Sequence, residues 1–395
     1  MKIGLVVDHF DPSRGGVETW TYQLAERLLR LAHEVHVVAE TFNHSLDLPK
    51  TGDSSGLIWH RLPAGTSRMR RGHAAETILR RLDLDVIHDM GVGWFCDVFH
   101  PHGGSRTAAF RQNLELAKPW LRPWKNLAAR ILPRYREFDR LLVKQYGGSH
   151  FVIALSKMVQ LDIREYHEVD RDRIRLVYNG VNIRRFSSED RATHREPVRS
   201  RLGLSDELLF LIVAHNYRLK GVPTLLQAMS LLKQTDDNIH LAIVGGKQPR
   251  PFIRMARRLG VEQHVSFLGA TDDIVPYYAA ADVYVQPTFY DPCSLVVLEA
   301  LGCGLPVITS GFNGASELME HGKHGFIVDD PGDAITLSHE MSKLRDEQVR
   351  EKMSHQCRSL SLRHTFTNNV DNILAVYREV IESRLGKKPY GRAAA

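Results

Sequence analysis

Two carboxylates flank an apolar run in the segment Phe289–Ser310. Asp291 precedes the run, and Glu299 interrupts it directly after Leu298. A carboxylate is costly to bury without a partner, so a Glu inside an otherwise apolar helix needs a ligand or a buried hydrogen-bond donor. Asp291 has an ordinary alternative explanation, because Asp often caps a helix and Pro292 suits the first helical position. Glu299 has no such explanation, and we predict that it binds a polar ligand.

Paired glycines and a basic loop stand at positions suited to a diphosphate. Gly15 and Gly16 separate a strand-like run from a helical stretch, where small residues let phosphate oxygens approach backbone N–H groups. The loop His215–Gly221 carries Arg218 and Lys220, either of which can neutralise a phosphate. A tight turn and a solvated basic loop are the alternative interpretations of these two segments.

The start of the helix predicted over Cys293–Leu301 is a third candidate for anion binding. The backbone N–H groups of a first helical turn have no partner within the helix, and the helix dipole favours a negative charge beside them. In this helix those groups belong to Ser294, Leu295 and Val296.

Two histidines close a strand-like run that ends at Phe99. His100 and His102 follow it, and His102 is succeeded by two glycines. Polar residues at such a strand end are well placed for binding or catalysis, although a single His is often only structural. His102 is the preferred candidate, with His100 as its competitor.

The segment around Glu299 resembles a known family. A carboxylate, seven residues, a Glu and then Cys303–Val307 (CGLPV) form a pattern similar to that of the retaining glycosyltransferases of family 4, also called glycosyltransferase group 1, which have the GT-B fold. The resemblance covers nearly the whole chain and is strongest from about Ile174 to Val328. The family usually has Glu where this chain has Asp291, and commonly has Arg where it has His215.

The resemblance implies roles in binding a nucleotide-diphospho-sugar. Glu299 would accept hydrogen bonds from the ribose hydroxyls, and Asp291 would reach hydroxyls of the transferred sugar. Lys220 would contact the diphosphate, with Arg218 as the second cation.

The remaining candidates carry over in the same way. Gly15 and Gly16 would lie against the donor phosphates, and His102 would face the donor sugar. Backbone groups around Phe267 and Leu268 would hold the base. Ser294, Leu295 and Val296 would offer the helix N-terminus to the phosphates.

The resemblance also implies a mechanism without a protein nucleophile. The departing phosphate would take the proton of the acceptor hydroxyl during substitution on the same face of the sugar, so the protein supplies mainly positioning and charge stabilisation. The chain has no Asp-x-Asp of the kind that binds a metal–diphosphate; Asp272–Asp273 and Asp329–Asp330 look like turns. We therefore expect no metal and no cofactor other than the nucleotide-sugar co-substrate.

The pattern of elements favours an α/β protein. Short β-branched runs alternate with helical stretches, which is typical of parallel sheets covered by helices. The predicted strands are Lys2–Val7, Glu34–Ala39, Asp85–Asp89, Phe151–Leu155, Leu209–Ala214, His240–Val244, Val283–Gln286 and Pro306–Thr309. The clearest helices are Val17–Leu31, Val222–Leu232 and Phe252–Leu259.

Two Rossmann-like domains are expected. Residues 1–185 would form the acceptor-side domain and residues 186–367 the nucleotide-sugar domain, joined by the polar stretch Asn179–Leu204, while a last helix over 368–384 would pack back onto the first domain. In open α/β sheets ligands bind at the carboxyl ends of the strands. The resemblance implies that the two domains face each other across a cleft that holds the site.

Composition limits the class of protein. Hydrophobic residues make up 43% of the 395 residues and charged residues 25%, which is ordinary for a globular protein. No run of 18 apolar residues suggests a transmembrane helix, the first residues do not resemble a signal peptide, and the four cysteines are scattered. A cytoplasmic location is expected.

The segment 105–146 is strongly basic. It holds ten Lys and Arg against three Asp and Glu, and Trp120 and Trp124 are interleaved with the charges. Cations combined with interfacial aromatics favour contact with an anionic membrane surface. Nucleic-acid binding and an ordinary solvated face are the alternatives. The resemblance favours the membrane, because family members that act on lipid-linked acceptors often use such a region, and we expect no nucleic-acid partner.

The predicted function is transfer of a hexose, from UDP-glucose or a similar donor, to a glycan or lipid-linked acceptor such as the lipopolysaccharide core. Features of the Lys220 loop and of Val244–Arg250 (VGGKQPR) look most like those of the family members that glucosylate that core. A nucleotide-sugar epimerase of the same fold and a non-catalytic glycan-binding relative are the alternatives. A nicotinamide-dependent enzyme is disfavoured, because no Gly-x-Gly-x-x-Gly turn follows the first strand.

Overall fold

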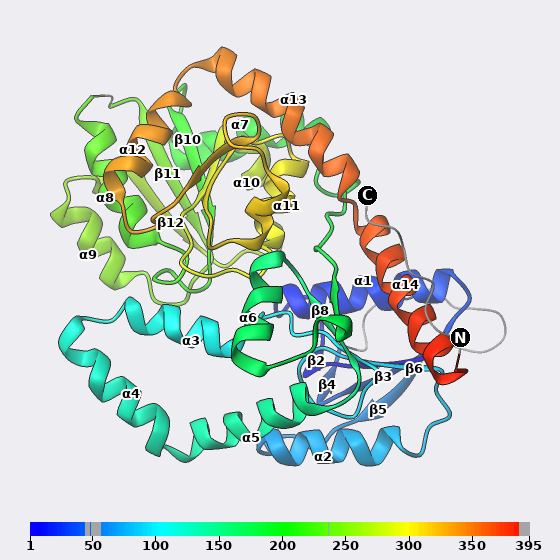
Figure 1. Ribbon diagram of the computed structural model, residues 1–395. Coiled ribbons are helices and arrows are strands. Elements are labelled where there is room, and N and C mark those ends of the chain that lie inside the picture. Colours follow the sequence, from blue (N-terminus) through cyan, green and yellow to red (C-terminus); the bar gives the residue numbers. More distant parts are fainter. Residues whose placement is uncertain (44–47, 49–56, 236, 387–395) are drawn as a thin grey trace. The chain divides into compact units, whose positions relative to one another are not determined.

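The computed structural model describes residues 1–43, 48, 57–235 and 237–386 (Figure 1). These residues form two compact units. Unit 1 contains residues 1–108, 117–177 and the chain from Val370 onward, and unit 2 contains residues 109–116 and 178–369.

Unit 1 is built on a parallel sheet. Among the described residues its strand order is β5-β3-β1-β6-β7-β8-β9, and each neighbouring pair is parallel. The strands are β1 (Lys2–Val6), β3 (Glu34–Ala39), β5 (Leu57–Arg61), β6 (Val86–Asp89), β7 (Val98–Phe99), β8 (Phe151–Ala154) and β9 (Ile174–Leu176). Two short strands, β2 (His9–Phe10) and β4 (Thr41–Phe42), pair separately.

Helices separate most strands of unit 1, because each crossover in a parallel sheet must return the chain to the same end of the sheet; β6 and β7 are joined by a loop. The helices are α1 (Gly16–Arg30), α2 (Arg68–Leu79), α4 (Arg122–Ile131), α5 (Pro133–Gly147) and α6 (Lys157–His167), with short turns η1 (Pro119–Leu121) and η2 (Arg171–Arg173). Two further helices, α3 (Arg106–Glu115) and α14 (Phe366–Arg384), cross the boundaries between the units.

Unit 2 repeats this architecture. Its parallel sheet has the order β12-β11-β10-β13-β14-β15. The strands are β10 (Leu208–Val213), β11 (Ile239–Val244), β12 (Val265–Gly269), β13 (Val283–Gln286), β14 (Val307–Ser310) and β15 (Gly325–Val328). The strand order reverses direction between β10 and β13, which is where open α/β sheets bind their ligands.

The helices of unit 2 lie on both sides of its sheet (Figure 1). They are α7 (Arg191–Leu202), α8 (Val222–Lys233), α9 (Arg250–Arg258), α10 (Val275–Ala280), α11 (Leu295–Gly302), α12 (Ala334–Lys343) and α13 (Glu347–Arg363), with short turns η3 (Ser188–Asp190), η4 (Glu262–His264) and η5 (Gly314–Leu318). A continuous apolar core joins the strands to α8 and α12; Phe210, Leu225 and Met341 are fully buried in it.

The α/β fold class predicted from the alternation of strands and helices is confirmed. Every predicted strand is present within one or two residues, since fully buried β-branched runs are unambiguous in this context. The alternative interpretation of Asp291 as a helix cap is excluded: α11 begins at Leu295 with Ser294 as its N-cap, two residues after the predicted start at Cys293.

The basic segment 105–146 folds as helices α3, α4 and α5, with the short turn η1 between α3 and α4. Trp124, Leu127 and Ile131 recur along α4 at the spacing of one helix face and are 68%, 46% and 60% exposed. Trp120, in η1, is 66% exposed. No helix among the described residues is both long and apolar enough to span a bilayer.

Candidate active site

Lys220 and Asp291 form an ion pair at the carboxyl edge of the unit 2 sheet. Lys220 lies in the loop between β10 and α8, and Asp291 lies in the loop after β13. Lys220 Nζ is 2.5 Å from Asp291 Oδ2, and their side chains are 21% and 12% exposed. The pair therefore joins the two loops that flank the reversal point of the strand order.

Glycine sets the path of the Lys220 loop. Gly221 has a φ of +77°, and a Cβ at this position would lie about 2.0 Å from the carbonyl oxygen of Pro287, so neither the conformation nor the space admits a side chain. Leu219 O accepts hydrogen bonds from the Phe289 backbone N–H at 2.8 Å and from Thr288 Oγ1 at 3.0 Å. These contacts hold Lys220 against the β13 loop.

Asp291 is further held by a polar network that the sequence did not reveal. Gln286 Nε2 donates to Asp291 Oδ2 at 3.1 Å and to Ser294 Oγ at 3.3 Å. Tyr284 donates its hydroxyl proton to Gln286 Oε1 at 2.6 Å. Gln286 and Tyr284 are fully buried, so the amide has a fixed orientation that aims its N–H groups at the site.

Backbone pairing explains why Asp291 is not a helix cap. Asp291 and Asn313 form an isolated parallel bridge. The Asp291 N–H donates to Phe312 O at 2.9 Å, and Asp291 O accepts from Gly314 N–H at 2.8 Å. Held in this extended pairing, the side chain is free to reach Lys220 instead of the first turn of α11.

The first turn of α11 is partly available for an anion. The Ser294 N–H is already occupied, because it donates to Asn313 Oδ1 at 3.2 Å. The Ser294 side chain does not cap the helix, which leaves the N–H groups of Leu295 and Val296 without an intrahelical acceptor. Of the three predicted residues, these two fit the expected role, while Ser294 contributes its hydroxyl to the Gln286 network.

Glu299 has one buried partner. Tyr278 donates its hydroxyl proton to Glu299 Oε2 at 2.9 Å, with Val296 O as a second acceptor at 3.1 Å. Burial raises the pKa of Glu299 to about 7, while the hydrogen bond from Tyr278 and the charge of Arg185 act in the opposite direction. Tyr278 is thus the buried hydrogen-bond donor that the sequence predicted Glu299 to need. With a pKa of about 7, the carboxyl group is present in both its neutral and its charged form near pH 7.

Three other predicted residues of unit 2 lie near the same edge but, within the part of the chain that the structure describes, form no hydrogen bond or ion pair with Asp291 or Glu299. Arg218 is exposed, and its side chain makes no ion pair with another described residue. Phe267 and Leu268 are half-buried at the end of β12. The neighbouring strand ends are tied together there, since the Gly245 N–H donates to Gly269 O at 2.5 Å.

In unit 1 the structure brings the glycine turn and the histidines together. Gly15 is the N-cap of α1 and Gly16 its first residue. One turn further along α1, Trp20 packs with ring centroids 4.9 Å from His100 and 4.5 Å from His102. Burial lowers the pKa of His102 to about 3, so this ring is neutral at pH 7 and acts as a hydrogen-bonding group rather than a cation.

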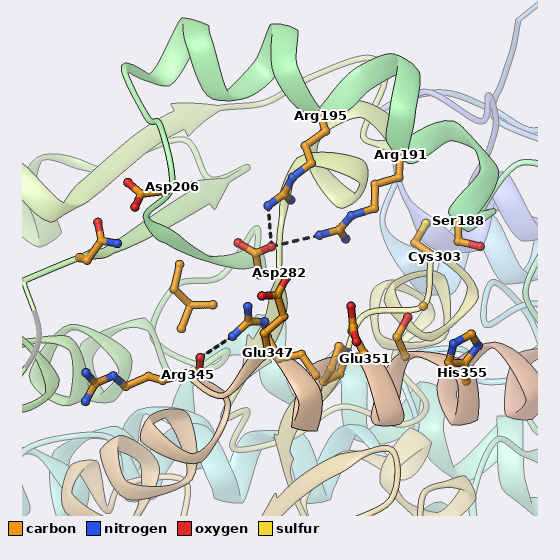
Figure 2. A pocket seen from close by; sticks show the side chains of 16 residues that line it. Ser188, Arg191, Arg195, Asp206, Asp282, Cys303, Arg345, Glu347, Glu351 and His355 are labelled. Carbon is orange, nitrogen blue, oxygen red and sulfur yellow. Dashed lines mark hydrogen bonds and ion pairs between the residues drawn. The ribbon is translucent and has the colours of Figure 1, made fainter.

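A large cavity of unit 2 lies at the opposite end of the strands. It has a volume of about 900 Å³ and is lined by Arg191, Arg195 and Asp282, among others (Figure 2). Asp282 directly precedes β13, so the cavity is at the amino edge of the sheet. The two arginines donate to Asp282 Oδ1 and to Ala281 O at the end of α10. Their donors already stabilise a helix end, so this cavity is not the site of the predicted chemistry.

The described residues contain no group of three or more His, Cys, Asp or Glu side chains arranged to hold a metal ion. Independence of metal stays a prediction.

Models of two families match the two halves of the chain. "Glycosyltransferase Family 4" matches residues 14–185, and "Glycosyl transferases group 1" matches residues 194–360. Together they cover the glycine turn, the histidines, the Lys220 loop and α11.

Several curated proteins are similar at about one identical residue in four. The lipopolysaccharide glucosyltransferase WaaG of Escherichia coli (strain K12) is 27% identical over 212 residues, which span 52% of this chain and only 56% of that protein. The GDP-mannose-dependent alpha-(1-6)-phosphatidylinositol monomannoside mannosyltransferase of Mycobacterium tuberculosis (strain ATCC 25618 / H37Rv) is 27% identical over 83% of this chain and 85% of its own length.

Solved structures share the fold. The crystal structure of WaaG aligns with a TM-score of 0.76 at 20% identity, covering 96% of this chain and 99% of that one. Anabaena Alr3699/HepE in complex with UDP-glucose aligns with a TM-score of 0.71 at 18% identity, covering 98% and 100%. The predicted GT-B fold is confirmed, and the chain belongs to the family 4, group 1 glycosyltransferases.

Proposed function

We propose that this glycosyltransferase moves a hexose from a nucleotide-diphospho-sugar to a lipid-linked glycan, such as a lipopolysaccharide core, and retains the anomeric configuration. UDP-glucose is the preferred donor. WaaG is named as a lipopolysaccharide glucosyltransferase, and HepE was solved with UDP-glucose. The GDP-mannose-dependent relative makes GDP-sugars the first alternative to test.

The observation that carries the proposal is the Lys220–Asp291 pair beside the open first turn of α11. A cation and free N–H groups suit a diphosphate, and a carboxylate suits the hydroxyls of the attached sugar. Glu299 lies one helical turn further along α11, where a ribose joined to that diphosphate would extend.

The chemistry follows from this division of roles. The bond from the sugar C1 to the diphosphate oxygen breaks, the acceptor oxygen bonds to C1 on the same face, and the acceptor proton passes to the departing phosphate. Negative charge grows on the diphosphate as it leaves, so Lys220 and the N–H groups of Leu295 and Val296 stabilise the transition state more than the ground state.

The donor can be identified without knowing the acceptor. Purified protein is incubated with UDP-, GDP- and ADP-sugars, and slow hydrolysis is followed by mass spectrometry. We expect one UDP-hexose to be cleaved, with release of the α-anomer by NMR. Conversion of one UDP-hexose into another without an acceptor would indicate an epimerase, and no turnover of any donor, even with a glycolipid acceptor, would indicate a non-catalytic relative.

We further propose that the exposed face of η1 and α4 binds an anionic membrane surface and so brings the enzyme to its lipid-linked acceptor. Lys118 and Lys125 are exposed beside Trp120 and Trp124. Cations attract anionic headgroups, and indole rings settle at the interface. An isolated cluster of exposed tryptophans of this kind is otherwise unfavourable on a protein surface.

A further inference from the structure

A buried hydrogen-bonded chain links the last helix of unit 1 to the histidines at the strand ends. Tyr377, on α14, has its hydroxyl oxygen 2.7 Å from His88 Nδ1, and His88 Nε2 is 3.2 Å from His100 Nδ1. Tyr377, His88 and His100 are all 0% exposed. The His100 ring then stacks on His102 with centroids 3.9 Å apart. Three polar residues from distant parts of the chain are thus joined in one line.

The line has a direction. Bonds donated by O–H groups cluster at shorter donor–acceptor distances than bonds donated by N–H groups, and the 2.7 Å separation fits a tyrosine that donates. His88 then accepts at Nδ1, so its proton is on Nε2 and is donated to His100 Nδ1. A neutral imidazole has one donor and one acceptor nitrogen, and His100 must therefore carry its own proton on Nε2.

At the far end of the line, His100 Nε2 and His102 Nε2 are both buried and form no hydrogen bond with any of the described residues. Burial lowers the pKa of His88 and His100 well below their ordinary value, so both rings are neutral. Each ring therefore keeps one donor and one acceptor nitrogen, in the order that Tyr377 sets. A buried N–H without a partner is rare in folded proteins, and a binding or catalytic role is one of its recognised explanations.

We propose that Tyr377 is a positioning residue, which acts through His88 to hold His100 Nε2 as a hydrogen-bond donor toward an oxygen of the substrate. The substrate oxygen is a phosphoryl or hydroxyl oxygen of the nucleotide-sugar, and in this respect the inference rests on the proposed function. His100 then contacts the substrate directly, while Trp20 and the stacked His102 ring fix its plane. Helix α14 thereby contributes to a site from which it is far removed in sequence.

The first test removes one hydroxyl group and reads the tautomers directly. In Tyr377→Phe the aromatic packing remains, but His88 Nδ1 loses its donor. Histidine side-chain ¹⁵N spectra of the full-length protein should show His100 protonated on Nε2 in wild type and a mixture of tautomers in the variant. Tyr146→Phe is the matched control, because Tyr146 is also buried and stacks on a histidine, His167, while its hydroxyl bonds to no histidine among the described residues. Identical His100 tautomers in wild type and Tyr377→Phe would overturn the proposal.

The second test separates positioning from folding. Tyr377→Phe should lower kcat about tenfold with a melting temperature close to that of wild type. In His100→Gln the amide places N–H donors near the position of Nε2 without any need for the relay, so adding Tyr377→Phe to that background should cause no further loss. An equal loss in both backgrounds would mean that Tyr377 acts only on packing.

The outcome is distinguishable from failure of the proposed function. If no nucleotide-sugar is turned over, the NMR spectra still test the assignment of the His100 tautomer. Addition of UDP-glucose, and separately of UDP, then tests the ligand: a shift of the His100 Nε2 signal with UDP-glucose supports the proposal. No shift at saturating concentrations of either compound contradicts it.

Discussion

Lys220 Nζ and Asp291 Oδ2 lie 2.5 Å apart although 71 positions separate the two residues in sequence. In the proposed function, the pair joins the cation that contacts the diphosphate to the carboxylate that contacts the sugar. Each side chain neutralises the other, so neither of these largely buried charges is left without a partner. A donor diphosphate would share Lys220 with Asp291, which leaves the carboxylate oxygens available to sugar hydroxyls.

Replacing Lys220 by Ala should lower kcat about 10²- to 10³-fold, the usual cost of losing one group that stabilises developing charge. The donor KM should rise as well, because the ground-state diphosphate also loses a cation. Steady-state kinetics with varied donor measure both effects. Lys323→Ala is the control, since Glu320 at the surface is the one ion-pair partner of Lys323 among the described residues, and the change should leave both constants unchanged. Wild-type kcat in Lys220→Ala at saturating donor would reduce Lys220 to a structural partner of Asp291.

Asp291 should tolerate Glu better than Asn. Asp291→Glu keeps the charge and restores the residue that the family usually carries, whereas Asp291→Asn removes the charge and leaves Lys220 unpaired. We expect Asp291→Glu to retain activity within a few-fold and Asp291→Asn to lose at least about tenfold in kcat, which corresponds to about 1.4 kcal/mol in the barrier. Equal activity of Asn and wild type would show that Asp291 serves only the backbone bridge to Asn313.

The sequence revealed Asp291 and Glu299 but not their partners, and the reason is physical. A carboxylate inside an apolar run is visible locally, because its burial cost is a property of its neighbours in sequence. Gln286 and Asn313 become partners only through the pairing of β13 with β14, and Tyr278 only because its hydroxyl group reaches α11. Those relationships depend on tertiary structure.

The fold was easier to predict from the sequence than the candidate site. Buried parallel strands such as β10 (LLFLIV) are continuous apolar runs, so both sheets were predictable from periodicity. Short or polar strands were not: β5 (LIWHR) is largely exposed at a sheet edge, and β7 has only two residues. The alternative interpretation of Asp291 as a helix cap fails because its backbone forms a bridge to Asn313 instead.

The pKa of Glu299 predicts a pH dependence of donor binding. Ribose hydroxyls donate to the ionised carboxylate, so the donor KM should fall as pH rises through about 7, where Glu299 loses its proton. The KM profile between pH 6 and 8 measures this effect. Glu299→Gln should flatten that profile and raise KM at pH 8. A sloping profile that survives in Glu299→Gln would assign the titration to another group.

Ionisation of Glu299 should favour donor binding but lower the stability of the folded protein. The folded protein holds this proton more tightly than the unfolded chain, because burial raises the pKa from 4.5 to about 7. Ionisation therefore costs stability progressively as pH rises between these two values. Glu299→Gln removes that cost, and its melting temperature at pH 8 should equal or exceed that of wild type. A variant that is inactive and also strongly destabilised at pH 8 would mean that Glu299 is needed for folding.

The basic face of η1 and α4 should bind anionic lipid vesicles in a salt-dependent way. Electrostatic attraction acts over roughly a Debye length, about 8 Å at physiological salt, and the tryptophans 66% and 68% exposed then enter the interface. Co-sedimentation should decrease with added salt and be absent with neutral vesicles. Tighter binding to DNA or RNA at the same salt would point instead to a nucleic-acid partner.

Charge reversal of Lys118, Arg122 and Lys125 to Glu should release the protein from anionic vesicles while leaving transfer to a water-soluble acceptor fragment unchanged. The control reverses three exposed cations elsewhere, Arg164, Lys323 and Lys352, and so makes the same change in net charge. Because net charge alone attracts a protein to a membrane without regard to position, only a difference between the two triple variants locates the binding surface. Equal loss of binding in both would show that attraction is general and that the η1–α4 face has no special role.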